Sequence, residues 1–183
     1  LDSAASTPLA PEAREAVIGA LDTVGNPGAA HAAGNEAAML VEGAREHVAR
    51  LMRVGPASVF FTGSATESNN MALRGLASER GRTSIVTTAA DHPSITATVS
   101  SASLGHQTKI IPISRSGEVN LDVVAQAVDQ DTHLVSVHAA NNETGVIQPL
   151  ERIADIAHAA GALVHTDASQ LMAWGEASFL DSC

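Results

Sequence analysis

Aromatic residues and cysteine are scarce in this sequence. Aromatic residues make up 2% of the 183 residues, and tyrosine is absent. An apolar core therefore has to be built from alanine, valine, isoleucine and leucine. The one cysteine, Cys183, excludes a disulfide within the chain, which suits a reducing compartment. An unpaired cysteine without a basic neighbour is usually a small apolar residue, so we do not expect Cys183 to be catalytic.

Positive charge and long apolar runs are also scarce. Lys and Arg number 10 against 20 Asp and Glu, and the formal charge of −10 argues against direct nucleic-acid binding. No apolar run is long enough to span a membrane and no signal peptide is recognisable, so we expect a cytoplasmic protein without a membrane partner. The sequence starts at Leu1 directly on a segment that reads as structured, and it stops at Cys183 without a closing element, so we expect a piece of a longer protein.

What the sequence does contain is an alternation of short apolar runs and helical patterns. The composition is 45% hydrophobic and 16% charged, as in globular proteins with a substantial core. Strands are predicted at residues 59–62, 84–88, 109–113, 133–138 and 162–166. Helices are predicted at residues 11–22, 35–52, 65–78, from about 93, 121–128 and 150–160. This order predicts an α/β fold with a mostly parallel sheet and helices on both faces.

Polar residues follow four of the predicted strands. They occupy residues 63–67, 91–92, 141–145 and 167–170. Ligands of parallel sheets bind at the carboxyl ends of the strands, so these clusters predict a binding site at that edge. Turn chemistry alone is a poor explanation for four such clusters.

The first cluster joins a strand to a helix. Its small residues let the backbone come close to a ligand, and the free N–H groups at a helix start suit a phosphate. Thr66 adds a hydroxyl. The alternative is an ordinary helix start, because Ser64 and Glu67 have the spacing of a capping box.

The other clusters also have both a chemical and a structural interpretation. His92 suits stacking on a flat cofactor or proton transfer, but also a loop histidine before a helix. Asn141 and Asn142 suit hydrogen bonding to a phenolic oxygen or a carboxylate, but also an asparagine-rich turn. Asp167 suits a protonated pyridinium nitrogen, because a buried carboxylate needs a cation, but also a cap of the next turn. Four further histidines are assigned surface or structural roles: His47, His106, His133 and His158.

These clusters, in this order and at these spacings, resemble the class V aminotransferase-like enzymes of fold type I, and among them the cysteine desulfurases. The resemblance starts with Leu1-Asp2-Ser3-Ala4-Ala5-Ser6-Thr7-Pro8 and runs to about Gln170. It includes Gly25-Asn26-Pro27 with His31, and Asn142-Glu143-x-Gly145 followed by Gln148-Pro149. It implies pyridoxal 5′-phosphate as the cofactor and no metal.

The resemblance also implies roles for six residues. Ala65 and Thr66 would bind the cofactor phosphate. His92 would stack on the ring and transfer a proton, which makes it the candidate catalytic residue. Asn142 would lie near the ring oxygen and the substrate. Asp167 would pair with the pyridine nitrogen, and Gln170 would bond the phenolic oxygen.

A reaction and a domain organisation follow from the same resemblance. The reaction would be removal of sulfur from L-cysteine, giving alanine and an enzyme persulfide. The enzyme would be a homodimer that passes sulfur to an acceptor protein, for iron–sulfur cluster assembly, tRNA thiolation or DNA sulfur modification. Residues 1–35 would pack on the cofactor domain, and residues 36–183 would be part of that domain, without its C-terminal part and a smaller second domain. A selenocysteine or cysteine lyase, an aminotransferase and a non-catalytic cofactor-binding fragment are the alternatives.

Two residues that complete this chemistry in the family have no counterpart in the sequence. The lysine that binds the cofactor and the cysteine that accepts sulfur both come after the segment that Gln170 matches. The one lysine, Lys109, is on a predicted strand and matches no catalytic position. We therefore expect the 183-residue chain to be inactive by itself.

Overall fold

The structure is a computed structural model, and it describes residues 3–76, 83–101 and 105–172. The chain divides into two compact units, Leu1–Phe61 and Thr62–Cys183. The division after residue 35 that the sequence suggested remains a prediction. Cys183 lies outside the described residues, as does the predicted end of a helix at residue 78.

The first unit holds two predicted helices and a short 3-10 turn. Helix α1 (Pro11–Leu21) starts with a proline, and α2 (Ala32–Leu51) is capped by His31, whose Nδ1 accepts a hydrogen bond from the Gly34 amide at 3.1 Å. The 3-10 turn η1 spans Pro56–Ser58. A Cβ on Gly25 would lie 2.1 Å from the Ala33 carbonyl oxygen, so the loop into α2 requires glycine there.

The prediction of a strand at residues 59–62 is wrong. Within the part of the chain that the structure describes, these residues pair with no strand. The Arg45 guanidinium of α2 instead donates a hydrogen bond to the Val59 carbonyl and lies 5.2 Å from the centre of the Phe61 ring. The apolar run of this segment is therefore held by a cation on a helix and not by a sheet.

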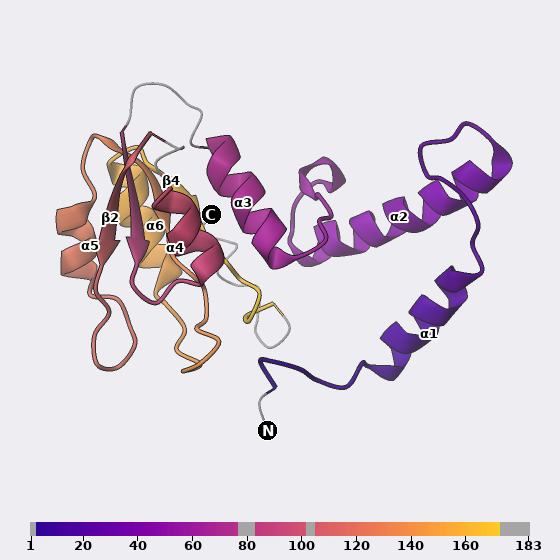
Figure 1. The fold of residues 1–183 in the computed structure, drawn as a ribbon, viewed down its shortest axis with the longest axis horizontal. Coiled ribbons are helices and arrows are strands. Elements are labelled where there is room, and N and C mark those ends of the chain that lie inside the picture. The colour runs from indigo at the N-terminus through magenta and orange to yellow at the C-terminus, as the bar shows by residue number, and fades with distance from the viewer. Residues whose placement is uncertain (1–2, 77–82, 102–104, 173–183) are drawn as a thin grey trace. The chain divides into compact units, whose positions relative to one another are not determined.

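The second unit is built on a parallel four-stranded sheet. Strands β1 (Ser84–Thr88), β2 (Gln107–Ile111), β3 (Thr132–Ser136) and β4 (Leu163–His165) have the order β2-β1-β3-β4, and every pair is parallel. The helices are α3 (Ala65–Leu76), α4 (Pro93–Val99), α5 (Leu121–Ala127) and α6 (Leu150–Ala159), as Figure 1 shows. The predicted α/β class, its parallel sheet and four of its five strands are confirmed.

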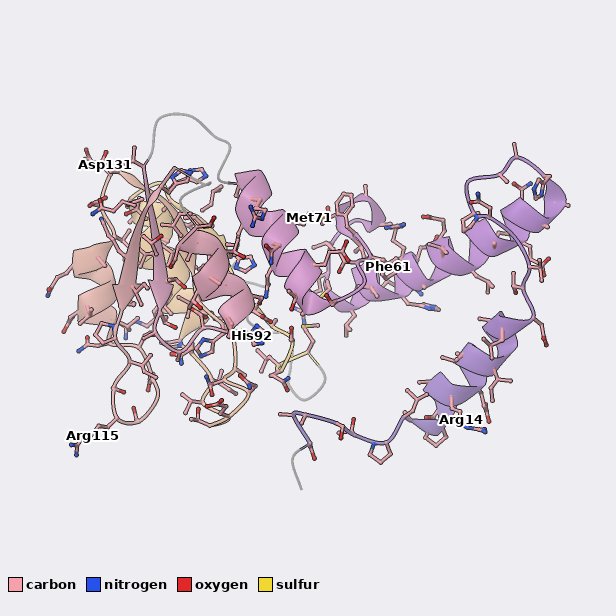
Figure 2. All side chains as sticks on the ribbon, viewed as in Figure 1. Arg14, Phe61, Met71, His92, Arg115 and Asp131 are labelled. Atoms are coloured by element: carbon pink, nitrogen blue, oxygen red, sulfur yellow. The ribbon has the colours of Figure 1, made fainter. Side chains whose placement is uncertain are left out.

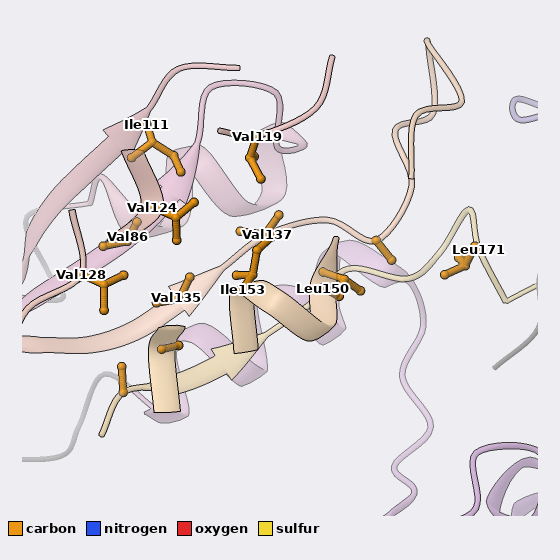
Figure 3. Packing of buried hydrophobic residues seen from close by; sticks show 13 residues of the cluster. Val86, Ile111, Val119, Val124, Val128, Val135, Val137, Leu150, Ile153 and Leu171 are labelled. Atoms are coloured by element: carbon orange, nitrogen blue, oxygen red, sulfur yellow. The ribbon is translucent and has the colours of Figure 1, made fainter. Parts of the chain in front are cut away.

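The sheet buries an apolar layer on each face. Ile85 and Leu134 pack with residues of α3 and α4: Leu73, Ile95 and Val99. Their neighbours Val86 and Val135 point the other way and pack with residues of α5 and α6, including Val124, Ile153 and Ala157 (Figure 3). Helices therefore cover both faces, as predicted, and both layers consist of the aliphatic residues that the scarcity of aromatic residues required.

Leu134 provides a test of this core. Its side chain is fully buried on the central strand β3. We expect Leu134→Ala to lower the free energy of unfolding by about 3 kcal/mol, measured by urea denaturation, because it removes buried methyl groups and leaves a cavity. The matched control is Leu163→Ala, since Leu163 pairs with Leu134 but is 39% exposed on the edge strand β4. Equal losses from the two variants would contradict this account of the core.

Two properties of the described ranges concern membranes and metals. None of the helices in the described ranges combines the length and apolar character needed to cross a bilayer. The same ranges hold no group of three metal-binding side chains.

Lys109, on the edge strand β2, donates hydrogen bonds to the Ala127 carbonyl at 3.0 Å and to Asp129 at 2.6 Å. It thus satisfies a carbonyl at the end of α5, which is a structural role.

Candidate functional site

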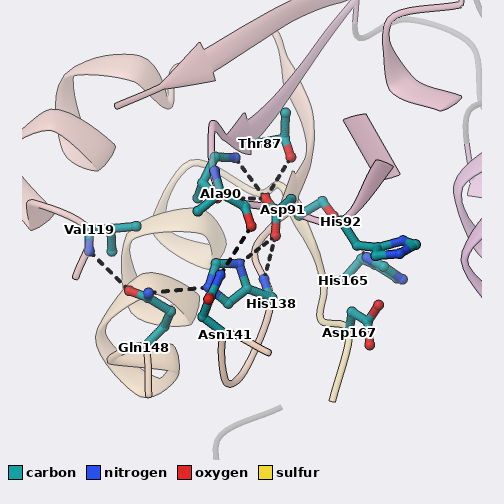
Figure 4. Close-up of polar contacts among 12 residues, drawn as sticks. Thr87, Ala90, Asp91, His92, Val119, His138, Asn141, Gln148, His165 and Asp167 are labelled. Carbon is teal, nitrogen blue, oxygen red and sulfur yellow. Dashed lines mark hydrogen bonds and ion pairs between the residues drawn. The ribbon is translucent and has the colours of Figure 1, made fainter. Parts of the chain in front are cut away.

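The carboxyl ends of three neighbouring strands bring the predicted site residues together. Asp91 and His92 follow β1, Asn141 follows β3, and Asp167 follows β4. These strands are adjacent in the sheet, so their ends meet at one edge (Figure 4). Asn69 of α3 reaches the same edge, because its Nδ2 lies 2.8 Å from Asp167 Oδ2.

Asp167 is a half-buried carboxylate with donors on both oxygens. Oδ1 accepts hydrogen bonds from the Ser169 amide at 3.0 Å and hydroxyl at 2.6 Å, and Oδ2 accepts one from Asn69. Burial raises the pKa of Asp167, but the hydrogen bonds from Ser169 and Asn69, helped by nearby His165, outweigh it and hold the pKa below its ordinary value. The site therefore keeps a fixed negative charge. The capping interpretation of Asp167 also holds, through Ser169.

His92 caps helix α4 and leaves its imidazole exposed. Its Nδ1 lies 3.1 Å from the Ser94 amide nitrogen and 2.8 Å from the Ser94 hydroxyl. Ser94 Oγ is also 3.0 Å from Asn69 Nδ2. His92 is labelled at the start of α4 in Figure 2, and the residue is exposed. The interpretation as a histidine before a helix is confirmed, and the ring remains available for chemistry.

The start of α3 combines a cap with unused donors. The Glu67 amide donates to Ser64 Oγ at 3.2 Å, and the Glu67 carboxylate accepts from the Gly63 amide at 2.7 Å, which makes a variant of the predicted capping box. Ala65 and Thr66 are exposed at the first two positions of the helix. Their backbone N–H groups have no carbonyl partner within the helix, so they are suited to an anion.

The α3 start faces the rest of the site through helical periodicity. Asn69 follows Ala65 by four residues and Thr66 by three, so the three share one face of α3. Asn69 is buried against Asp167 and Ser94. Ala65 and Thr66 therefore lie one turn from Asn69, whose amide contacts the Asp167 carboxylate.

Asn141 has a structural role in the turn after β3, whereas the neighbouring Asn142 is exposed. Asn141 Oδ1 accepts hydrogen bonds from the Glu143 and Thr144 amides at 3.0 and 2.9 Å, so the asparagine-turn interpretation is correct for Asn141. Asn142 is exposed in the same turn. Gln170 is half-buried in the turn after Asp167. The roles predicted for Asn142 and Gln170 towards a cofactor stay predictions.

A buried polar network beside the site was missed by sequence reasoning. The Asp91 carboxylate accepts hydrogen bonds from the backbone and Nδ1 of His138, both at 2.8 Å, and from Thr87 and Thr88 (Figure 4). Gln148 Nε2 lies 3.3 Å from His138 Nε2, and Gln148 Oε1 accepts from a backbone amide at 3.0 Å. The only local signal was the position of Asp91 and His138 just after strands.

Burial and hydrogen bonding act in opposite directions on Asp91. Burial raises the pKa of the Asp91 carboxyl, but hydrogen bonds from His138, Thr88 and Thr87 outweigh it and hold the pKa below its ordinary value. The network ties the loop before His92 to the turn that carries Asn142. These buried hydrogen bonds position the loops that carry His92 and Asn142, and neither of these two side chains takes part in them.

Three further histidines of this unit, His165, His133 and His106, make contacts within the fold. His165 Nδ1 is 2.9 Å from Ser136 Oγ, and burial lowers the pKa of His165 although Asp167 and Asp91 act to raise it. His133 is buried, contacts a backbone carbonyl and stacks on His106 with 5.8 Å between ring centres. The structural assignments of His106 and His133 are confirmed.

Known proteins are similar to this chain in sequence and in fold. The sequence model of the family described as aminotransferase class-V matches residues 1–178. The cysteine desulfurase IscS of Methylobacillus flagellatus is 39% identical over 177 residues, which cover 93% of this chain and 44% of that protein. Two solved structures also align with this chain.

The first is a NifS-like protein, with a TM-score of 0.88 and 39% identity over 93% of this chain and 48% of its own. The second is SspA in complex with cysteine, with a TM-score of 0.89 and 31% identity over 98% of this chain and 54% of its own. The chain thus spans about half the length of the relatives that it matches.

Proposed function

The chain belongs to the aminotransferase class-V family, and on this premise we propose that the whole protein is a pyridoxal 5′-phosphate-dependent cysteine desulfurase. It would convert L-cysteine and an enzyme thiol into L-alanine and an enzyme persulfide, with the sulfur leaving Cβ of the substrate for the thiol. Relatives named cysteine desulfurase and the SspA structure in complex with cysteine support the substrate. The observation that carries the proposal is the Asp167 carboxylate, kept ionised at the end of β4 beside His92 and the start of α3.

The residues at this edge fit the proposed cofactor. The unused N–H groups at the start of α3 suit a phosphate, and Thr66 adds a hydroxyl. The Asp167 carboxylate is half-buried and has hydrogen-bond donors but, among the residues that the structure describes, no Lys or Arg contact. A protonated ring nitrogen would supply the cation that such a group favours. The exposed imidazole of His92 provides a flat surface for a ring.

Each residue has a defined task in this proposal. Ala65 and Thr66 bind the phosphate, Asp167 holds the proton on the ring nitrogen, and His92 covers the ring and donates or accepts a proton. When bound, pyridoxal 5′-phosphate withdraws electrons from Cα of the attached amino acid. Asn142 would contact the substrate, and Gln170 would bond the phenolic oxygen of the cofactor.

The proposal needs two groups beyond these residues. Lys109 is engaged at the end of α5, so another lysine of the whole protein has to bind the cofactor. A second group, a thiol, has to accept the sulfur. We also propose, from the family resemblance, a cytoplasmic homodimer that passes its persulfide sulfur to an acceptor protein, with iron–sulfur cluster assembly as one destination. Residues 1–35 then pack on the cofactor domain to which residues 36–183 belong.

Product analysis tests the proposed reaction. The longest natural polypeptide that contains this chain is supplied with pyridoxal 5′-phosphate, L-cysteine and a reducing thiol. We expect alanine and sulfide in equal amounts, because the thiol releases the persulfide sulfur. Pyruvate in place of alanine would favour a lyase, and amino-group transfer to a keto acid would favour an aminotransferase. The 183-residue chain by itself is the negative control, and sustained sulfide release by it would contradict the need for a further lysine.

A further inference from the structure

One side-chain amide links two groups that the proposed site depends on. Asn69 Nδ2 lies 2.8 Å from Asp167 Oδ2 and 3.0 Å from Ser94 Oγ, and Ser94 contacts His92. We propose that Asn69 is a positioning residue that acts partly through Ser94. It holds the Asp167 carboxylate and the His92 imidazole in one geometry, and through the Ser94 hydroxyl it reinforces the Nε2–H form of neutral His92 that the Ser94 backbone amide favours. What the site binds rests on the proposed function, whereas the proton position does not.

The direction of the first two hydrogen bonds follows from donor and acceptor chemistry. An ionised carboxylate only accepts hydrogen bonds, and an amide nitrogen carries two hydrogens. Asn69 therefore donates one hydrogen to Asp167 and the other to Ser94 Oγ. The reversed amide would place its oxygen against the carboxylate of Asp167, which is repulsive. The orientation of the Asn69 amide is thus fixed by Asp167.

The direction of the next bond follows from the first two. Because Ser94 Oγ accepts from Asn69, its own hydrogen is free to go to His92 Nδ1, 2.8 Å away. The Ser94 backbone amide donates to the same nitrogen at 3.1 Å. Nδ1 is then an acceptor, and the neutral ring carries its proton on Nε2. His92 therefore presents an N–H group, and not a lone pair, to a ligand at the site.

Burial makes this chain of bonds hard to rearrange. Asn69 is 4% exposed and Ser94 is 8% exposed, whereas His92, the last residue in this series of hydrogen bonds, is exposed to solvent. Buried polar atoms that lose a partner are strongly unfavourable, so the bonds are expected to persist when a ligand arrives. The bonds join α3 to the end of β4 and the start of α4. A shift of any one of these elements would therefore move both site groups.

The tautomer of His92 gives a readout that a merely structural asparagine would not move. Nitrogen-15 NMR of the cofactor-free chain is expected to show His92 Nδ1 unprotonated and Nε2 protonated. In Asn69→Ala the Ser94 hydroxyl loses the donor that orients it, while the Ser94 backbone amide still donates to Nδ1, so we expect the Nδ1–H form to rise to a detectable minor share. Ser94→Ala should also give a mixture of tautomers, and Ser94→Thr, which keeps the hydroxyl, should restore the wild-type shifts.

Asn70 provides a matched control on the same helix. Its amide donates to the Thr66 carbonyl at 3.0 Å and accepts from Thr98 at 3.0 Å, so Asn70→Ala removes a similar side chain without touching Asp167. In the whole protein we expect Asn69→Ala to weaken pyridoxal 5′-phosphate binding about tenfold, the effect of one hydrogen bond to a charged group. Asn70→Ala should change it less than about twofold. Reconstitution of the cofactor-free protein gives both dissociation constants.

The two experiments separate this inference from the proposed function. Absence of pyridoxal 5′-phosphate binding by the wild type would overturn the proposed function, and the NMR result would still decide the role of Asn69. A wild-type His92 protonated on Nδ1 would overturn the inference. So would an Asn69→Ala protein whose tautomer and cofactor affinity both match those of Asn70→Ala. If Asn69→Ala does not fold, Ser94→Ala, which removes a single oxygen, decides by the same NMR signals.

Discussion

Replacing Asp91 with alanine is expected to lower the free energy of unfolding by about 4 kcal/mol, a larger loss than that expected for Leu134→Ala. The two carboxylate oxygens accept five hydrogen bonds, from the side chains and backbone of Thr87, Thr88 and His138. All of these donors are buried with Asp91. Alanine leaves them without an acceptor, and each unmet donor is unfavourable. Urea denaturation at pH 7, followed by circular dichroism, measures the loss.

Two variants show whether the carboxylate itself matters. Asp91→Asn keeps the size of the side chain but turns a donor towards donors, so we expect a loss of at least about 2 kcal/mol. Asp155→Ala on the exposed side of α6 is the control, with an expected change of less than about 0.5 kcal/mol. A wild-type stability in Asp91→Asn would contradict the role given to the charged acceptor.

The stabilisation from Asp91 should depend on pH in one direction. The pKa of folded Asp91 is below its ordinary value of 3.8. A carboxyl with a depressed pKa stabilises the folded state above the pKa of the unfolded chain, and the effect is lost as pH falls through the folded pKa. The difference in unfolding free energy between wild type and Asp91→Ala should therefore be constant at neutral pH and shrink below about pH 4. A difference that grows in acid would contradict the ionised state of Asp91.

The fold was predictable because its signals are local. Four of the five short apolar runs formed strands within a few residues of the expected bounds, and the helical patterns formed helices, as with β1 at Ser84–Thr88 and α6 at Leu150–Ala159. The failure at residues 59–62 has a physical reason, since an apolar run of four residues carries no information about its partner. Arg45 of α2 supplied that partner instead of a strand.

The site was predictable only where a strand end marked it. Asp91, His92 and Asp167 follow strands, so the rule for parallel sheets pointed to them. Asn69 lies in the interior of α3, where asparagine has no local meaning, and its contact with Asp167 spans 98 residues. His138 became part of a network only when β3 was placed beside β1. Long-range pairing, which no short pattern encodes, separates the residues found from those missed.

Asp167→Asn is expected to reduce alanine formation by the whole protein at least about 100-fold while the fold remains intact. The variant removes the negative charge that would hold a proton on the ring nitrogen, and without that proton electrons are withdrawn less strongly. An asparagine oxygen still accepts from Asn69, and the Ser169 hydroxyl is able to turn and accept from the new amide. The Ser169 backbone amide loses its acceptor, so we expect a modest loss of stability without loss of the fold. Steady-state kinetics with L-cysteine measures the loss in kcat.

Several comparisons assign that loss to the charge of Asp167. Asp155→Asn on α6 removes the same charge away from the site and should leave kcat unchanged. The pKa of Asp167 is below its ordinary value, so the carboxylate is fully ionised from pH 6 to pH 9 and the ratio of wild-type to variant kcat should not vary with pH through titration of Asp167. Full alanine production by a folded Asp167→Asn protein would contradict the role of Asp167. An equal loss in Asp155→Asn would show instead that the whole protein responds to net charge and not to a charge at the end of β4.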